Sequence, residues 1–554
     1  MRSSALIAAL AILVGAVTTP TSRALAAGHL CPDAVELEQW RLVLDAEWIA
    51  CVRLDDLTTT ANPYTDPNSL TGMGFPPPGT GTLNSHYTDP TTPAVPGIQI
   101  HGYFSDGCNA FLNEPVLTAK NGVPFMPGCV PAPAPAGATC LVGCHHDGQV
   151  VLRIPDAWNA RLLTAGTPGI RDAFSSDFIL SDFALEHGWA YVAQDKGNMG
   201  ANFYQSGCDE IGRCATWPDT CVDVSTPWCP AAAVAEWTFR MRQATRSARA
   251  LLDRLAPSYG QPRVVRSYAA GISNGGYQVR RALETDTSRD RLYDGGVDWE
   301  GTLFLSRLPA GVTTAGPKTG FNLFTYLPTS LAKWPNDLVE GDPSVRDLAD
   351  VGFEPASQPL WPYHWSIYWG LTQKIYRLEF DPEYTRFTCS DVLTAGPACV
   401  APPALQVPPA DPDAAYDYPA RLAALPPLAA RLDRVANTGD IQHPLITLHG
   451  DQDALLPIRT DSDIYTQLVA LQHRGARHRY YVVAGGNHVD GQFDDHYGVD
   501  PYGDTLRPML PCVRAAVDAL VAWVEQSAPP PPSRTIARLG TSAEELANRC
   551  RLTD

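Results

Sequence analysis

From residue 148 onward, short apolar runs alternate with longer stretches of helical apolar spacing. The runs are bounded by turn residues and read QVVLRIP, ARLLTAG, WAYVAQD, VVRSYAA, HPLITLHGD and RYYVVAGG. The clearest helical pattern covers residues 232–255. Strands that alternate with helices are typical of an α/β fold, with a mostly parallel sheet and helices on both faces. The sequence therefore predicts this fold class, and it contains no internal repeat.

Composition divides the chain into segments around this pattern. Residues 27–145 are rich in Pro, Gly, Thr and Cys, with one helical stretch at 33–48 and one strand at 97–104. A Pro- and aromatic-rich stretch interrupts the α/β pattern, and SAPPPPSR ends the last helix. We expect a signal peptide (1–26), an N-terminal region (27–147), a core in two parts (148–300 and 436–526), a lid insertion (301–435) and a C-terminal tail (527–554).

The first 26 residues have the features of an export signal. Arg2 supplies positive charge, an apolar run follows from Ala5 to Val17, and Ala24-Leu25-Ala26 resembles a cleavage site. The apolar run is too short to span a bilayer, and no later segment reads as a membrane helix. The sequence therefore predicts a secreted protein, extracellular or periplasmic, without a membrane partner.

The cysteines agree with export. All fourteen follow the predicted signal peptide, and an even number in an oxidising compartment indicates disulfides, seven at most. One cluster, Cys140, Cys144, His145 and His146, has the residue types of a zinc site. Adjacent histidines do not easily reach one ion, so disulfides are favoured and we expect no metal or cofactor. The short-loop pairs Cys389–Cys399 and Cys221–Cys229 are candidate bridges.

The formal net charge of the chain is -18. Nucleic-acid binding requires clustered Lys and Arg, so this charge excludes a nucleic-acid partner.

A possible nucleophile lies in the middle of the chain. Residues 271–275, Gly-Ile-Ser-Asn-Gly, match G-x-S-x-G. A chain with 44 glycines can contain this pattern by chance, so its context decides. A strand-like run at 264–270 precedes it and a helical run at 277–284 follows it, which is the setting of a nucleophile elbow. Gly271 and Gly275 would lie where side chains clash, and Gly276 would let the helix approach the sheet.

A nucleophilic serine needs a base and an orienting acid, in the chain order Ser, acid, His. Asp451 and Asp453 follow the strand that ends at His449-Gly450. His488 follows the next strand after a Gly-Gly turn. Other downstream histidines fit less well: His473 and His478 precede that strand, and His496 lies further out. The sequence predicts Ser273 and His488 as nucleophile and base, with an aspartate of the first loop as acid.

Several motifs resemble one group of enzymes. HGDQDALLP is similar to a common pattern of the α/β-hydrolase superfamily, whose second acidic position is the triad acid; the resemblance assigns that role to Asp453. IPDAWNARLLTAGTPG, GWAYVAQDKGN and the S-N-G-G elbow resemble secreted tannases and feruloyl esterases, and also the extracellular 3-hydroxybutyrate oligomer hydrolases. The resemblance covers about 148–300 and 436–525 and implies an α/β-hydrolase fold. Tannase-type esterases carry bonded cysteines beside serine and histidine, where this chain has Ile272 and Val489. They also often carry a calcium-binding run, which we do not find here.

The oxyanion hole needs two backbone N–H groups. The residue after the nucleophile, Asn274, supplies one. The other comes from the loop TAGTPGIRD, in which Pro168 has no N–H. Gly166 and Thr167 remain, and we favour Thr167.

Further side chains are predicted to line the pocket because they follow strand ends or belong to the lid. They are Asp195, Trp299, Glu300 and Trp365. Trp365 lies between Trp361 and Trp369 at helical spacing, a pattern more typical of a packed lid core than of a substrate platform.

These features together predict a serine carboxylic-ester hydrolase that works through an acyl-enzyme on a small-molecule or oligomeric ester. Short hydroxyalkanoate oligomers of the 3-hydroxybutyrate type, or simple esters, are the favoured substrates. An aromatic esterase of the tannase or feruloyl type is the alternative. A catalytically inactive extracellular binding protein and an acyltransferase are further alternatives.

Overall fold

The fold is taken from a computed structural model of the 554-residue chain. The structure describes residues 29–59, 61–62, 94–104, 148–169, 173–174, 176–196, 232–263, 265–333, 343, 345–365, 369, 373–381, 383–384, 412–488, 490, 506–538 and 550–553.

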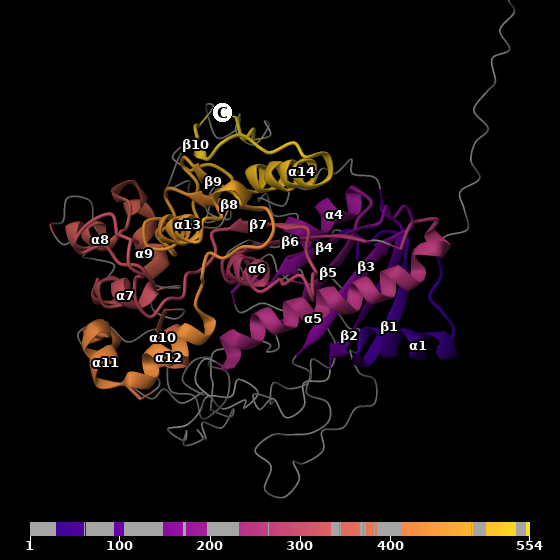
Figure 1. Cartoon of the computed structure of the whole chain (residues 1–554), viewed down its shortest axis with the longest axis horizontal. Coiled ribbons are helices and arrows are strands. Elements are labelled where there is room, and N and C mark those ends of the chain that lie inside the picture. Colours follow the sequence, from indigo (N-terminus) through magenta and orange to yellow (C-terminus); the bar gives the residue numbers. More distant parts are fainter. Residues whose placement is uncertain are drawn as a thin grey trace, which may run out of the picture.

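One sheet of ten strands organises these residues (Figure 1). In chain order the strands are β1 (Ala46–Leu54), β2 (Gly97–Phe104), β3 (Gln149–Pro155), β4 (Arg161–Gly166), β5 (Ala190–Gln194), β6 (Arg266–Ile272), β7 (Gly295–Trp299), β8 (Leu445–Gly450), β9 (His478–Val483) and β10 (Arg534–Ile536). In space their order is β1-β2-β3-β5-β4-β6-β7-β8-β9-β10.

Strand direction divides the sheet into two parts. Three neighbouring pairs are antiparallel: β1–β2, β2–β3 and β3–β5. Every other neighbouring pair in the sheet order, from β5–β4 to β9–β10, is parallel. The carboxyl ends of the parallel strands therefore share one edge, which is where sites form in such sheets. This strand order and these directions are those of the α/β-hydrolase fold, which confirms the predicted fold class.

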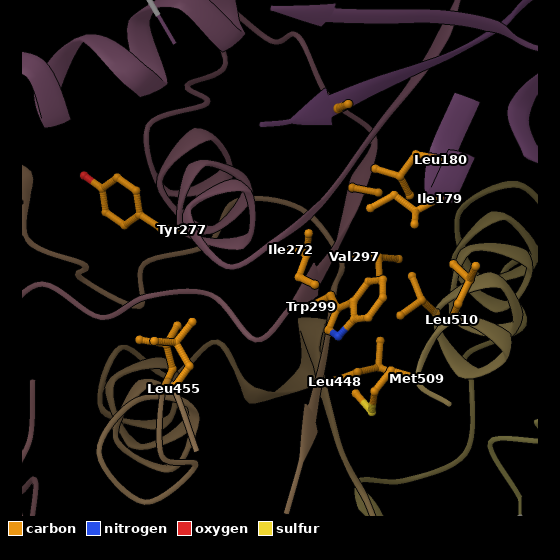
Figure 2. Close-up of a cluster of buried hydrophobic side chains, with 14 of the residues drawn as sticks. Ile179, Leu180, Ile272, Tyr277, Val297, Trp299, Leu448, Leu455, Met509 and Leu510 are labelled. Carbon is orange, nitrogen blue, oxygen red and sulfur yellow. The ribbon is translucent and has the colours of Figure 1, made fainter. Parts of the chain in front are cut away.

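Helices cover both faces of the sheet. They are α1 (Ala34–Leu44), α4 (Asp182–Glu186), α5 (Ala232–Leu255), α6 (Asn274–Glu284), α7 (Leu323–Ala332), α8 (Val345–Val351), α9 (Trp361–His364), α10 (Lys374–Phe380), α11 (Tyr418–Ala424), α12 (Pro426–Val435), α13 (Ser462–Leu471) and α14 (Leu510–Gln526). Figure 2 shows α6 and α14 on opposite sides of the central strands, and α5 packs beside α6.

Local sequence explains where the first helix begins and ends. The Asp33 carboxylate accepts hydrogen bonds from the N–H groups of Val35 (3.0 Å) and Glu36 (2.9 Å), as an N-cap does. Asp45, at φ 54°, then ends α1 in the left-handed region. The predicted helical stretch at 33–48 is therefore too long, because its last residues belong to β1.

Part of the main core lies between the sheet and α14 (Figure 2). Val297 and Trp299 of β7 point towards Met509 and Leu510, and Leu448 of β8 lies beside them. All five side chains are at most 3% exposed. This packing fixes β7 and β8 in the sheet, and their carboxyl ends carry site residues.

Helices α7–α12 all lie between β7 and β8 in sequence and gather at one end of the molecule (Figure 1). Trp361, Trp365 and Trp369 are at most 4% exposed. The Trp369 indole donates to the Ala454 carbonyl (2.9 Å), and that of Trp365 lies 3.4 Å from the Leu331 carbonyl. The three tryptophans therefore pack inside this helical group and against the loop that follows β8.

Two disulfides are present in the described ranges, Cys31–Cys51 and Cys512–Cys550. The candidate bridges Cys389–Cys399 and Cys221–Cys229, the cluster at 140–146 and the predicted signal peptide lie outside the described residues. Among the helices of those ranges, none is long and apolar enough to cross a membrane.

Candidate active site

Ser273 occupies the sharp turn between β6 and α6. Its backbone has φ 60° and ψ -122°, a conformation that is strained for a residue with a side chain. The Ser273 N–H donates to the Trp299 carbonyl (2.9 Å), and the Ser273 carbonyl accepts from the Tyr277 N–H (3.0 Å). The turn is thus held by the neighbouring strand and by the first turn of the helix.

Glycines allow this turn to form. A Cβ on Gly275 would lie 2.2 Å from the Gly166 carbonyl oxygen, and one on Gly271 would lie 2.6 Å from the Gly275 carbonyl carbon. On Gly276 it would lie 2.7 Å from the Gly301 Cα. Backbone therefore touches backbone where β4, β6 and α6 meet, as the motif predicts for its glycines.

His488 and Asp453 form a direct pair. His488 Nδ1 lies 2.7 Å from Asp453 Oδ2, and both residues are at most 2% exposed. Because a carboxylate oxygen is the partner, Nδ1 carries the proton and Nε2 keeps its lone pair. Burial alone would raise the pKa of Asp453, but the adjacent imidazole of His488 and hydrogen bonds from His449 and His488 hold that pKa below its usual range.

The two candidate acids have different partners. Asp453 Oδ1 accepts from the N–H groups of Leu455 (2.8 Å) and Leu456 (2.9 Å), which aims Oδ2 at His488. Asp451 Oδ1 instead accepts from the Gly485 N–H (2.8 Å). Asp451 therefore stabilises the turn that leads to His488, whereas Asp453 contacts its ring.

A second histidine, His449, also contacts the Asp453 carboxylate. His449 Nε2 lies 2.9 Å from the Leu456 carbonyl, so it must be the protonated nitrogen, and it lies 3.2 Å from Asp453 Oδ2. His449 Nδ1 then accepts from the Ser462 hydroxyl (2.6 Å), which itself accepts from Arg280 (2.7 Å). This chain of donors was not predicted from the sequence, where its only signal is the place of His449 at a strand end.

The Ser273 and His488 side chains are not hydrogen-bonded to each other in this structure. Within the described residues, no hydrogen bond joins the two side chains, although each lies at the carboxyl end of its strand or in the loop that follows. β6, β7, β8 and β9 are consecutive neighbours in the sheet, so the four ends lie side by side. His478, at the start of β9, and His473 before it lie towards the opposite edge, as predicted.

The two candidate oxyanion loops are tied together by one side chain. Gln278 Nε2 donates to the carbonyls of Thr167 (2.8 Å) and Asn274 (3.0 Å). Gln278 Oε1 accepts from Gln194 Nε2 (2.8 Å). Gly166 ends β4 in register with Gly271. Gln278 therefore holds the carbonyls of Thr167 and Asn274, each on the peptide that follows the candidate donor N–H, a role that its position one turn after Asn274 could have suggested.

The helices between β7 and β8 reach this site. The Tyr376 hydroxyl of α10 donates to Asn274 Oδ1, which also accepts from the Thr302 hydroxyl (3.1 Å). His364 of α9 is buried near Asp453 and His488, and burial lowers its pKa to about 3. Both residues were absent from the sequence prediction, because contacts between segments distant in sequence leave no local pattern.

The four residues predicted to line a pocket are all buried. The Asp195 carboxylate accepts from the N–H groups of Gly148 (3.0 Å) and Gln149 (2.8 Å), which joins β5 to β3. Trp299 points into the core towards α14 (Figure 2). Trp365 packs within helices α7–α12. The fourth, Glu300, is fully buried with Oε2 3.4 Å from His488 Nδ1.

Comparison with known proteins supports the predicted class. Residues 344–550 match the model of the family described as 3HB-oligomer hydrolase (3HBOH). The match covers less than half of the chain. It confirms the predicted resemblance and the predicted enzyme class, a carboxylic-ester hydrolase. No curated protein matches the sequence.

Several solved structures are similar to this chain. Feruloyl esterase B from Aspergillus oryzae is 14% identical over 88% of each chain, with a TM-score of 0.43. Tannin acyl hydrolase from Aspergillus niger is 12% identical over 86% of this chain and 83% of its own (TM-score 0.42). Candida antarctica lipase A in its closed state is 10% identical over 89% of this chain and 94% of its own (TM-score 0.38).

Proposed function

We propose that this chain is a secreted serine hydrolase that cleaves short 3-hydroxybutyrate-type oligomers or simple esters with Ser273, His488 and Asp453. The buried His488–Asp453 hydrogen bond of 2.7 Å carries the proposal. It fixes the imidazole tautomer that a general base needs. The family match over residues 344–550 supports the substrate class.

The reaction follows from these positions. His488 Nε2 takes the proton of Ser273 Oγ while the oxygen attacks the ester carbonyl. The imidazolium is stabilised by Asp453, which stays ionised. His488 then returns the proton to the leaving alcohol, and water attacks the acyl-enzyme by the same route.

Charge on the carbonyl oxygen is met by backbone donors. Asn274 is the first residue of α6, and the first N–H groups of a helix have no partner within it. The N–H of Thr167 would supply the second hydrogen bond, and Gln278 holds the carbonyl of the same residue. Loss of one such donor costs about 10²–10³ in kcat in enzymes of this kind.

The residues beside the triad support oligomers or simple esters over tannins and ferulates. Ile272 precedes Ser273, where the tannase-type esterases carry a bonded cysteine. Its partner position, Val489, lies outside the described residues. Export is supported by the signal-like N-terminus and by the Cys31–Cys51 and Cys512–Cys550 disulfides.

The test compares purified wild type with Ser273→Ala. A fluorophosphonate probe should label wild type at Ser273 only, and the variant should lose ester hydrolysis while its circular dichroism stays the same. kcat/KM should be higher for 3-hydroxybutyrate oligomers than for methyl ferulate or methyl gallate. Hydrolysis retained by the variant contradicts the mechanism. An aromatic preference contradicts the substrate, and transfer to an added alcohol in place of hydrolysis indicates an acyltransferase.

A further inference from the structure

Glu300 directly follows β7, the strand between the one that ends at Ser273 and the one that leads to Asp453. Its φ is 52°, in the left-handed region, and its N–H donates to the Leu448 carbonyl (2.9 Å). A residue with a side chain keeps this conformation only when its surroundings enforce it. The result places the carboxyl group between β7 and β8, where Oε1 accepts from the Gly450 N–H (2.7 Å).

Glu300 is therefore a second carboxyl group beside the candidate base. Oε2 lies 3.4 Å from His488 Nδ1, the nitrogen that Asp453 contacts at 2.7 Å. One ligand atom from each of the three residues lies within 4.8 Å of the others, and all three are buried. Two carboxylates in one buried site cannot both ionise at neutral pH without a large penalty.

Hydrogen-bond partners decide which of the two is charged. Asp453 accepts from two backbone N–H groups and from His488, with His449 at 3.2 Å. Glu300 Oε1 has one backbone donor, and Oε2 has no hydrogen-bond partner within the described residues. Burial, followed by the charges of Asp453, Asp490 and Asp298, raises the pKa of Glu300 well above its usual value.

We propose that Glu300 is a second acid of the catalytic site, a neutral positioning residue in the native enzyme that replaces Asp453 as partner of His488 when Asp453 is substituted by a neutral residue. In that case the Glu300 O–H bond breaks, the proton passes to solvent, and the carboxylate accepts from His488 Nδ1–H. The inference rests on the proposed function, because it takes His488 as the base.

The experiment compares wild type, Glu300→Gln, Asp453→Asn and the double variant by kcat/KM against pH. The kcat/KM of Asp453→Asn should fall by less than the roughly 10⁴-fold expected when a triad loses its single acid. Its activity should rise with pH as Glu300 ionises. The double variant should lose at least about tenfold more and should lack this rise. Asp451→Asn is the matched control, since its carboxylate contacts Gly485 and not His488.

Glu300→Gln alone tests the neutral state. The acid limb of its kcat/KM–pH profile should keep the wild-type midpoint, because an amide replaces an uncharged carboxylic acid. A midpoint lowered by more than about half a pH unit would show that Glu300 is ionised in the native enzyme. Infrared difference spectra at neutral pH give an independent readout: wild type should show a protonated carboxyl band that Glu300→Gln lacks.

Two results overturn the inference: equal activities and pH profiles for Asp453→Asn and the double variant, or no protonated carboxyl band. Both can occur while Ser273→Ala is inactive, and then the serine mechanism stands without a second acid. Activity in Ser273→Ala would instead contradict the proposed function itself. Circular dichroism on every variant separates loss of fold from loss of chemistry.

Discussion

The glycine contact between the elbow and the neighbouring loop makes Gly275→Ala an informative substitution. The added Cβ would lie 2.2 Å from the Gly166 carbonyl oxygen and 2.6 Å from its carbonyl carbon, whereas ordinary contacts are 3.4–4 Å. Both atoms belong to the backbone of β4, which is paired on both sides. The loop after β4 must therefore move by about 1 Å, since no side chain can rotate away.

Two opposing terms set the effect on stability. Alanine is favoured over glycine inside a helix by about 1 kcal/mol. Overpacking of this kind typically destabilises by about 1–3 kcal/mol. Because the clash is with backbone, we expect Gly275→Ala to lower the free energy of unfolding by about 1–2 kcal/mol. A displacement of about 1 Å at the oxyanion loop should lower kcat/KM by about 10²-fold.

Urea unfolding and chromogenic-ester kinetics measure the two effects. Gly475→Ala is the control, because a Cβ there would have no atom within 4 Å and the residue has no left-handed φ. Its stability should stay within about 0.5 kcal/mol of wild type. If Gly275→Ala is as stable and as active as that control, the elbow and the loop after β4 are not in backbone contact and the reasoning is refuted.

Two other substitutions test groups around the site and the sheet. Gln278→Leu removes the donor to the Thr167 and Asn274 carbonyls, so kcat should fall by about 10–10²-fold with little change in KM; a rise in KM at constant kcat would show a role in binding instead. Burial, with Arg280 and Arg479, lowers the pKa of His478 from 6.5 to about 3. The unfolded chain then binds a proton below about pH 6.5 that the folded chain does not, so the free energy of unfolding decreases as pH falls from there towards about 3. His478→Gln should make this decrease shallower in urea titrations at about pH 7 and about pH 4.5, and an unchanged slope would contradict the assignment.

Much of the central sheet could be predicted because its strands are short apolar runs between turn residues. The runs at 97–104 and 149–155, and the helix at 232–255, coincide with β2, β3 and α5. The outer strands were harder. β10 lies in the segment predicted as a tail, and only pairing with β9, distant in sequence, makes it a strand.

Some residues of the candidate site could likewise be predicted from the sequence, and others could not. Ser273, Asp453 and His488 stand out because each follows a strand with turn residues beside it. Glu300 also follows a strand, but its direction depends on a positive φ, and no sequence pattern signals that conformation. Trp299, one residue earlier, faces the opposite side, because alternate strand residues point to opposite faces.

The two edges of the sheet differ in their exposure to other chains. An edge strand offers unpaired N–H and carbonyl groups to any extended segment, which makes it a starting point for aggregation. β10 has three residues and follows four consecutive prolines, which have no N–H to donate. β1 has nine residues and a register shift between Ala46 and Trp48. Glu47 is exposed near its start, and Arg53 near its end is paired with Asp156 (2.6 Å). Within the described residues β1 is the longer of the two edge strands, so we expect self-association of the concentrated protein to begin along β1 rather than β10.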